Sequence, residues 1–418
     1  MKKRILALSL AAAMVVGALA SGNGSETTVS SQEAVEARDV ALVLWGSEDD
    51  QDFLKEVSAT FATDYAASHD DVKSITVDVK IVGEGDSATE ALKDINAAAD
   101  VFGVPGDQTG ALADAKAIYA MPDAVASEIK TLVGENTAAK TFYNGSYYGF
   151  PYSPNTAQAL YYNKNVFTED DVKSLNTMLE KEGVTGKVLG TETGAFHSTT
   201  WYFTGGGELF TGSDKSICTF DQDSVAEVLE FVQNNAEKLF AGSSEDAVNL
   251  IKDGGLAAWL AGSWDAGKMA DAFGDNMAVA MLPKVTVNGT DYQMKCFGGV
   301  KYYAVNAASK EPEVAIALAQ YLSSADVQLK KYTDYKAKGK LAVPTALSLL
   351  DNATIKADPV ATAYMQQGEY IVVQEPVIPG DWWGDAEALY KAIFNGEVKG
   401  KDAIKEEIAK HVETWKAM

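Results

Sequence analysis

The sequence predicts an α/β protein of two lobes, each a mostly parallel sheet flanked by helices and joined by a hinge. Three observations support this prediction. The chain has 418 residues, more than a single hydrophobic core usually serves. Hydrophobic residues make up 47% of it and charged residues 22%, so most of the chain can bury a core. From residue 39 onward, strand-like and helix-like patterns alternate along the chain, as in α/β folds.

The start of the chain has the pattern of an export signal. Basic residues at positions 2–4 precede an uncharged apolar run that ends in small residues typical of a cleavage site. We therefore expect residues 1–20 to be a signal peptide. Residues 21–38 are rich in Gly, Ser, Thr and Glu and predict either a flexible tether or a plain disordered terminus. The mature protein is expected outside the cytoplasm.

The first folded segment has the pattern of a βαβαβ unit. We expect strands at 40–45, 75–82 and 100–105, with a helix at 88–99 between the last two. Strands that alternate with helices in this way predict a parallel sheet with right-handed crossovers. Another helix is expected between the first two strands, because apolar residues recur there every four positions, at Phe53, Val57, Phe61 and Tyr65.

The later elements continue the alternation. Asn144-Gly145 and Asn288-Gly289 predict two hairpin turns, since this dipeptide accepts the positive φ angles of a type I′ turn. Strands are expected at 157–162, 256–260 and 300–306, and a helix at 312–324. Three further helices are predicted by apolar faces, which consist of Val225, Val228, Leu229 and Val232; of Ala386, Leu389, Tyr390 and Ile393; and of Ile404, Ile408 and Val412.

Polar side chains follow each of the first three strands. Ligands of α/β folds bind beyond the carboxyl ends of the strands, so these loops are candidates for a binding site. A single acid at such a position often only caps the following helix, and it is the recurrence in three loops that favours a site. The candidates are Trp45, Asp49 and Asp50 after the first strand, Glu84 after the second, and Asp107 and Gln108 after the third.

Three tryptophans lie beside Gly and Asp in loop-like sequence. An aromatic face stacks on the C–H surface of a pyranose ring, while carboxylates and amides hydrogen-bond its hydroxyls. This combination favours a sugar ligand. Trp259 and Trp415 instead lie on apolar faces and are expected in the core. The candidates for the site are Trp264, Asp265, Trp382 and Trp383.

Charge and residue usage narrow the ligand class. The formal net charge of −24 repels nucleic acid and anionic lipid. Arginine occurs only at Arg4 and Arg38, so the folded body is expected to lack the side chain best suited to carboxylates and phosphates, and a neutral or cationic solute is favoured. Scattered histidines and cysteines give no metal-ligand spacing, and we expect no metal and no cofactor. Cys218 and Cys296 either form a disulfide or are two separate buried thiols.

The sequence resembles the extracellular solute-binding proteins of maltose-binding type, and within them the maltose- and maltodextrin-binding branch of Firmicutes. Four segments carry the resemblance in family order, namely 142–151, 160–164, 254–264 and 305–309. It implies an N-lobe of residues 39–153 and 302–350 and a C-lobe of residues 154–301 and 351–418, closing over a sugar by hinge motion. In a lipoprotein of this type a cysteine would stand where this chain has Gly22, so the lipid anchor stays open.

Residue by residue, the resemblance implies roles for the candidates. Three groups of candidates match loops of the first lobe. They are Trp45 with Asp49 or Asp50, Glu84, and the Asp107-Gln108 pair. Asn155 matches a cleft position just after the first crossing between the lobes. Trp264 and Trp383 match the aromatic platforms of the second lobe, and Phe196 or His197 lies near a family tyrosine.

We therefore predict a monomeric solute-binding component of an ABC importer that binds maltose or a related α-glucan oligosaccharide and delivers it to a membrane permease without reacting it. Two alternatives stay open. A secreted glycosidase would also be acidic and aromatic-rich, and it needs only two carboxylates roughly 5 to 9.5 Å apart. A binding protein for a polyamine or peptide would pair its acids with amines and use Trp264 and Trp383 for cation–π contacts.

Overall fold

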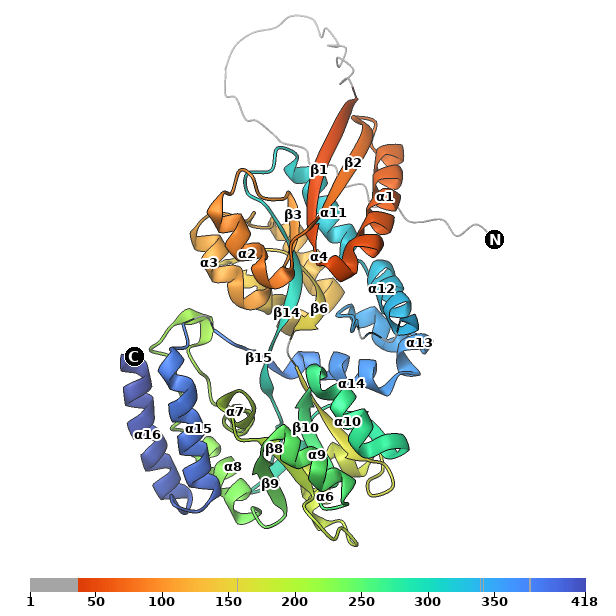
Figure 1. The fold of residues 1–418 in the computed structure, drawn as a ribbon. Coiled ribbons are helices and arrows are strands. Elements are labelled where there is room, and N and C mark those ends of the chain that lie inside the picture. The colour runs from red at the N-terminus through yellow and green to blue at the C-terminus, as the bar shows by residue number, and fades with distance from the viewer. Residues whose placement is uncertain (1–36, 156, 339, 341, 376) are drawn as a thin grey trace, which may run out of the picture.

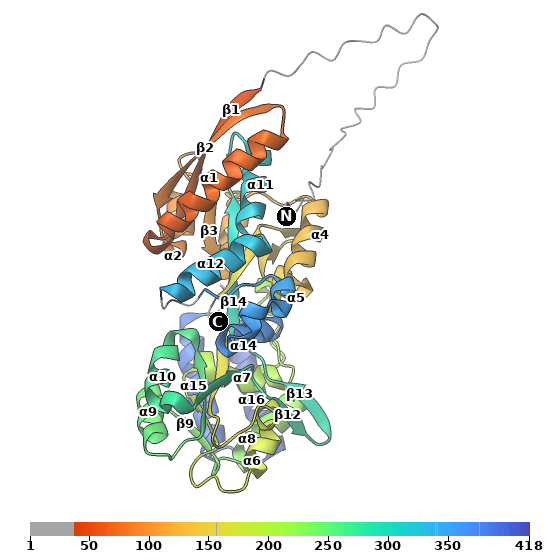
Figure 2. The same cartoon turned by 90° about the vertical axis from the view of Figure 1, so that its right-hand side faces the viewer.

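The computed structural model describes residues 37–155, 157–338, 340, 342–375 and 377–418. The predicted signal peptide, Gly22 and most of the predicted tether lie outside these residues. Figure 1 shows two lobes, one above the other, and Figure 2 shows the same division from the side. Within the described residues, no helix is long and apolar enough to cross a membrane.

The first lobe contains a sheet of six strands among the described residues, in the order β15-β14-β3-β1-β2 with β6 beside β14. Three of its pairings are parallel and two, made by β14, are antiparallel. The strands are β1 (Arg38–Gly46), β2 (Val72–Ile81), β3 (Val101–Pro105), β6 (Phe150–Asn155), β14 (Cys296–Val305) and β15 (Ile371–Val373).

Alternate residues of β1 serve two cores on the two faces of this sheet. Val40, Leu42 and Leu44 pack with α1 and α11 on one face, and Trp45 packs with α2 and α3 on the other. The helices are α1 (Gln51–Ser68), α2 (Glu84–Lys93), α3 (Thr109–Asp114), α4 (Asp123–Val133), α5 (Glu135–Ala138), α11 (Pro312–Leu322) and α12 (Ala325–Ala337). The hairpin β4 (Phe142–Tyr143) and β5 (Ser146–Tyr147) follows α5.

The second lobe is built on a five-stranded sheet, as far as the structure describes the chain, in the order β11-β7-β10-β8-β9. Its two parallel and two antiparallel pairings make it mixed, where the sequence predicted a mostly parallel sheet. The reason is that β7 runs against both of its neighbours. The strands are β7 (Gln158–Asn163), β8 (Leu189–Glu192), β9 (Leu239–Gly242), β10 (Ala258–Gly262) and β11 (Met277–Ala280), with a separate hairpin of β12 (Lys284–Val287) and β13 (Thr290–Gln293).

Helices cover both faces of the second sheet. On one face, α7, α8, α15 and α16 bury Leu160 and Leu260, and on the other, α9, α10 and α14 bury Tyr161 and Trp259. These helices are α7 (Ala195–Thr204), α8 (Asp223–Asn234), α9 (Ser244–Lys252), α10 (Ala266–Phe273), α14 (Pro359–Gln367), α15 (Gly380–Phe394) and α16 (Lys401–Ala417), and the short helices α6 (Leu175–Glu180) and α13 (Ala353–Lys356) complete the set.

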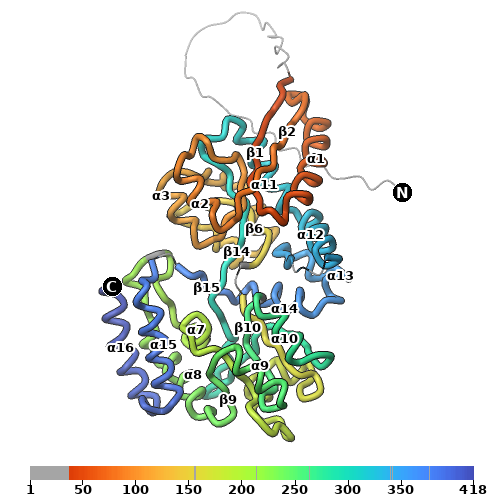
Figure 3. Tube along the Cα trace, in the orientation of Figure 1, coloured from red at the N-terminus to blue at the C-terminus, as the bar shows by residue number. Residues whose placement is uncertain are grey.

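The chain crosses between the two sheets at β6 to β7 and returns along β14. Figure 3 traces β14 as one continuous segment from the lower lobe into the upper one. Its first residues pair with β15, and its last residues pair with β3 and β6. A strand shared in this way couples the two lobes, so the region around β14 and β15 is the place about which they would move relative to each other.

Most predicted elements are confirmed, with two further corrections. Both Asn-Gly dipeptides have positive φ at both residues and turn hairpins. The helix predicted at 88–99 is α2, which begins at Glu84 and ends at Lys93, because Asp94 is already extended. Arg38 belongs to β1 and forms ion pairs with Asp71 and Glu311, so the folded body does contain an arginine.

The two cysteines are free thiols rather than a disulfide. Both side chains are buried, Cys218 before α8 and Cys296 at the start of β14. Burial raises the pKa of the Cys218 thiol to about 11 and that of the Cys296 thiol to about 12. Both therefore stay protonated and unreactive near neutral pH.

Candidate functional site

The carboxyl ends of β1 and β2 border a polar cavity in the first lobe. It has a volume of about 330 Å³, and in Figure 1 the end of β1 points down toward the second lobe. Three predicted site residues line it, namely Asp49, Asp50 and Glu84. They come together because parallel strands end at the same edge of a sheet. We call this space the polar cavity.

Asp50 is buried at the start of α1 and is held by two side chains of α12. It accepts a hydrogen bond from the Tyr335 hydroxyl, and the Lys331 ammonium lies 3.1 Å away. Burial would raise the pKa of Asp50, but the charge of Lys331 and these hydrogen bonds outweigh it and hold the pKa below its usual value. Asp50 is therefore a fixed carboxylate at neutral pH.

Glu84 lines the polar cavity from the N-terminus of α2. It accepts a hydrogen bond of 2.7 Å from the Tyr152 hydroxyl and one of 3.0 Å from the Lys301 ammonium. Tyr152 stacks on Tyr303 with ring centroids 4.3 Å apart, so the hydroxyl is held in place by packing. Burial, with the nearby carboxylate, raises the pKa of Tyr152, which keeps it a hydrogen-bond donor.

Each carboxylate of the polar cavity is paired with a lysine. Lys331 pairs with Asp50, and Lys301 pairs with Glu84. A third pair forms between Lys340 and the exposed Asp49, at 2.9 Å. The cavity therefore presents ammonium and hydroxyl donors beside carboxylate acceptors, with little net charge. Such a surface suits a neutral ligand with many hydroxyl groups.

Trp45 does not line the polar cavity. Its side chain is only 8% exposed, and its ring packs against Phe102 with centroids 5.8 Å apart. It belongs to the core on the α2 side of the first sheet. In this structure Trp45 is a core residue, because helices cover both faces of the first sheet, and the placement of its ring does not support the predicted contact with ligand.

Asp107 and Gln108 lie in the next loop, beside a different space. Asp107 lines cavities of about 100 Å³ and 260 Å³ together with Lys140 near β14 and β15, and burial raises the pKa of its carboxyl group. Gln108 donates a hydrogen bond of 3.3 Å to the carbonyl of Gly85, which ties this loop to the start of α2. The larger of these two cavities also reaches Gly212 of the second lobe, so it lies where the lobes meet.

The second lobe offers a cluster of aromatic rings next to β14. Trp264, in the turn between β10 and α10, is 49% exposed. Phe196 of α7 lies 5.8 Å from Trp264 and 5.7 Å from Phe297 of β14, and Trp383 also lies 5.7 Å from Phe297. The His197 ring is 6.1 Å from Trp264. We call this cluster of Phe196, His197, Trp264, Phe297 and Trp383 the aromatic wall.

Two predicted residues of the second lobe are structural instead. Trp382 is fully buried and packs against Trp415 at 5.8 Å, because the first turn of α15 directs it into the core while its neighbour Trp383 stays half-buried at the surface. Asp265 is buried and forms a 2.9 Å ion pair with Lys268 of α10. The placement of these two side chains in this structure therefore does not support the predicted contacts with ligand. Asn155 ends β6 opposite Gly299, and its side chain lies outside the described residues.

Sequence reasoning missed the partners of the acids. The polar cavity also contains Tyr152, Lys301, Lys331 and Tyr335. Tyr152 follows the Gly-Phe-Pro sequence of the crossing, which was a usable signal. Lys331 and Tyr335 gave none, because they approach Asp50 from 281 and 285 residues away along the chain.

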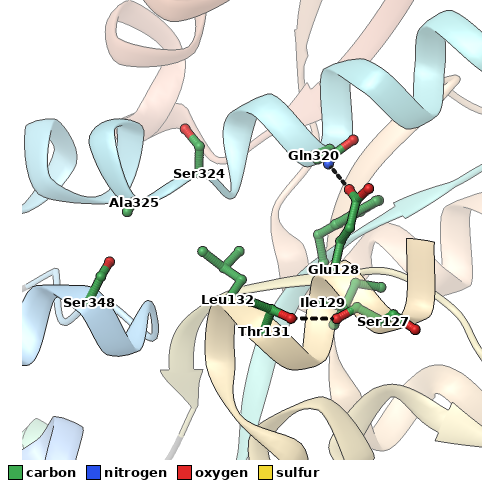
Figure 4. Close-up of a pocket in the computed structure, with 10 residues that line it drawn as sticks. Ser127, Glu128, Ile129, Thr131, Leu132, Gln320, Ser324, Ala325 and Ser348 are labelled. Atoms are coloured by element: carbon green, nitrogen blue, oxygen red, sulfur yellow. Dashed lines mark hydrogen bonds between the residues drawn. The ribbon is translucent and has the colours of Figure 1, made fainter. Parts of the chain in front are cut away.

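Another cavity of the first lobe, of about 540 Å³, is larger than the polar cavity and lies between α4 and the α11–α12 segment (Figure 4). Leu132 and Ile129 form its apolar side, and Glu128 at its rim accepts a hydrogen bond from Gln320. None of the predicted site residues lines it. Volume alone does not make it the candidate site, because its described lining residues include no carboxylate–lysine pair like those of the polar cavity.

Comparison with known proteins identifies the family. The family model described as bacterial extracellular solute-binding protein matches residues 60–363, most of the chain. The chain belongs to this family. As a member of an extracellular family, this solute-binding protein is exported, and its predicted family and two-lobed fold are confirmed.

Individual relatives agree with this assignment. The galactooligosaccharide-binding protein of Bacillus subtilis (strain 168) is 24% identical over 432 residues, covering 97% of this chain and 95% of the relative. A ligand-free maltodextrin-binding protein from L. casei BL23 superimposes with a TM-score of 0.72 at 25% identity, covering 90% and 98% of the two chains. The maltose complex of a maltose-binding protein from Listeria monocytogenes gives 0.69 at 22% identity, covering 90% and 97%, and shows the shared fold.

Proposed function

We propose that this solute-binding protein captures a neutral oligosaccharide of the maltose and maltooligosaccharide class between the polar cavity and the aromatic wall. The observation that supports this most is the pairing of a charge-balanced cavity in one lobe with the half-exposed indole of Trp264 in the other. Hydroxyl groups would bind the cavity, and a pyranose face would stack on the indole. Relatives named for binding galactooligosaccharide and maltotriose support the sugar class.

The charge of the polar cavity argues against a cationic solute. A polyamine needs carboxylates that are free to pair with its ammonium groups, whereas Asp50 and Glu84 already lie 3.1 Å and 3.0 Å from lysine ammonium groups. Placing a second cation there would add like-charge repulsion to the loss of an existing pair. A neutral polyol meets no such cost.

The same groups argue against glycoside hydrolysis. A glycosidase needs a general acid whose raised pKa keeps it protonated near neutral pH. Asp50 has a lowered pKa, and Glu84 accepts two hydrogen bonds from donors. Asp107 has a raised pKa, but it lines a different cavity from these two acids. We therefore assign a binding role and no catalytic step.

Sugar bound by both lobes would favour the closed arrangement, since only that arrangement allows contact with both surfaces. We assign an N-lobe of residues 39–153 and 302–350 and a C-lobe of residues 154–301 and 351–418. This division assigns β15 and the first residues of β14 to the C-lobe, although they pair within the six-stranded sheet. The closed monomer would present the sugar to an ABC permease in the membrane. Residues 1–20 are assigned as the signal peptide that directs export.

Calorimetric titration of the mature protein with maltotriose, a galactooligosaccharide and spermidine tests the proposal. We expect heat with maltotriose, no new products by chromatography, and a smaller radius of gyration in solution scattering when sugar is bound. Trp264→Ala should weaken maltotriose binding by about 1 to 3 kcal/mol through the lost stacking contact. Leu92→Ala, which truncates an exposed side chain of α2, is the control and should bind normally. Heat from spermidine alone, or turnover of the sugar, would refute the assignment.

A further inference from the structure

The indole of Trp264 rests on the backbone of Gly262. A Cβ atom added to Gly262 would lie 2.2 Å from the Cη2 and Cζ2 atoms of the indole and 2.3 Å from its Cζ3 atom. The φ angle of Gly262 is not in the left-handed region, so the backbone at this position would accept any L residue. Space for the ring is therefore the reason that the structure gives for glycine here.

The strand beneath the indole is fixed. Gly262 is the last residue of β10, an inner strand of the second sheet, and is paired with Gln158 of β7. The indole, by contrast, is half exposed and belongs to a turn. If a methyl group were added at Gly262, the ring would move and the strand would stay, because moving the strand would break buried ladder hydrogen bonds.

The ring is also bounded at its edges. Phe196 meets it at an interplanar angle of 63° and His197 at 61°. With the Gly262 backbone under part of one face and two rings at the edges, the indole has a defined height and tilt. The structure leaves its exposed half as the surface on which a ligand can stack.

We propose that Gly262 is the positioning residue for the Trp264 platform and sets the height at which a sugar ring stacks. This inference rests on the proposed sugar binding. The shortest ordinary contact of a Cβ atom is 3.4 Å, so an alanine at this position displaces the near edge of the indole by at least 1.2 Å. A displacement of that size separates or tilts a stacked pair and removes most of its contact energy.

Gly262→Ala tests the proposal, with Gly267→Ala of α10 as the matched control, because a Cβ atom there meets nothing within 4 Å. We expect Gly262→Ala to weaken maltotriose binding about tenfold and Gly267→Ala to leave it unchanged. Both variants should keep the thermal unfolding midpoint of the parent. In a Trp264→Ala background, Gly262→Ala should have no further effect, since the ring it displaces is gone.

Crystal structures of the ligand-free parent and of Gly262→Ala provide a measurement that does not depend on sugar. An indole in the same position in both structures would overturn the proposal. So would unchanged affinity despite a displaced indole, or an equal loss of affinity in the Trp264→Ala background. If the parent protein failed to bind maltotriose, the proposed function would fall, while the two structures would still show whether Gly262 sets the position of the ring.

Discussion

Acidification should destabilise this protein through one buried histidine of the aromatic wall. His197 lies on α7 beside the rings of Phe196 and Trp264, with its Nδ1 atom 3.3 Å from Glu192. Burial lowers its pKa from the ordinary 6.5 to about 4, and the Asp265 carboxylate opposes this by a smaller amount. Between these two pH values, the unfolded chain binds a proton at this position that the folded chain does not bind.

The sign and size of the effect follow from proton linkage. Because the folded pKa is the lower one, the stabilising contribution is complete above pH 6.5 and is lost progressively as the pH falls to 4. One pKa unit corresponds to about 1.36 kcal/mol, so the difference between 6.5 and about 4 corresponds to a loss of about 3 kcal/mol in the free energy of unfolding. The imidazole is buried, so solvent screens this effect only weakly.

Urea unfolding of the parent and of His197→Gln, measured between pH 7.5 and 4, isolates the contribution. We expect the parent to lose about 3 kcal/mol more than the variant over this range. Repeating the series in 1 M NaCl should leave most of the difference in place, because desolvation is insensitive to salt whereas a surface ion pair is screened. Parallel stability curves for the two proteins would refute the argument.

Three further predictions concern stability and binding. Lys331→Met leaves the buried Asp50 carboxylate without its cation and should lower the free energy of unfolding in urea by about 3 kcal/mol. Adding Asp50→Asn to this variant should restore part of the lost stability. An unchanged free energy of unfolding in Lys331→Met would contradict the pairing. Trp382→Ala should lower the free energy of unfolding by about 3 to 5 kcal/mol in the same assay, because Trp382 is fully buried. Trp383→Ala should mainly weaken maltotriose binding. The reverse pattern would make Trp383 the core residue and Trp382 the ligand contact. Burial lowers the pKa of Lys140 from 10.5 to about 8, so between these pH values the unfolded chain binds more protons at this position than the folded chain does. The stability of the parent relative to Lys140→Met should therefore rise by up to about 3 kcal/mol from pH 8 to 10.5. A constant difference between the two proteins would contradict this.

Much of the fold could be predicted because its signals are local. The Asn144-Gly145 and Asn288-Gly289 turns depend on two residues that accept positive φ, and both formed hairpins. The apolar face of 225–232 became the buried side of α8. The direction of β7 was not predictable in this way, because an antiparallel pairing depends on which distant strand lies beside it.

The residues of the candidate site could likewise be predicted only where the signal was local in the sequence. Asp49, Asp50 and Glu84 could be predicted because the carboxyl ends of neighbouring parallel strands meet. The adjacent residues Trp382 and Trp383 could not be distinguished from composition. Only the packing of α15 decided which of the two rings enters the core and which joins the aromatic wall.

By itself, the sequence determined the order of the elements, the two-lobed class and the loops that form the candidate ligand site, since each depends on residues close together in the chain. The tertiary structure alone decided the charge of that site. Lys301 and Lys331 reach Glu84 and Asp50 across 217 and 281 residues, and no local pattern marks them as partners. Coulomb forces act over a few ångströms of space rather than along the chain, so an acidic loop became a balanced cavity only when folding brought the lysines beside it.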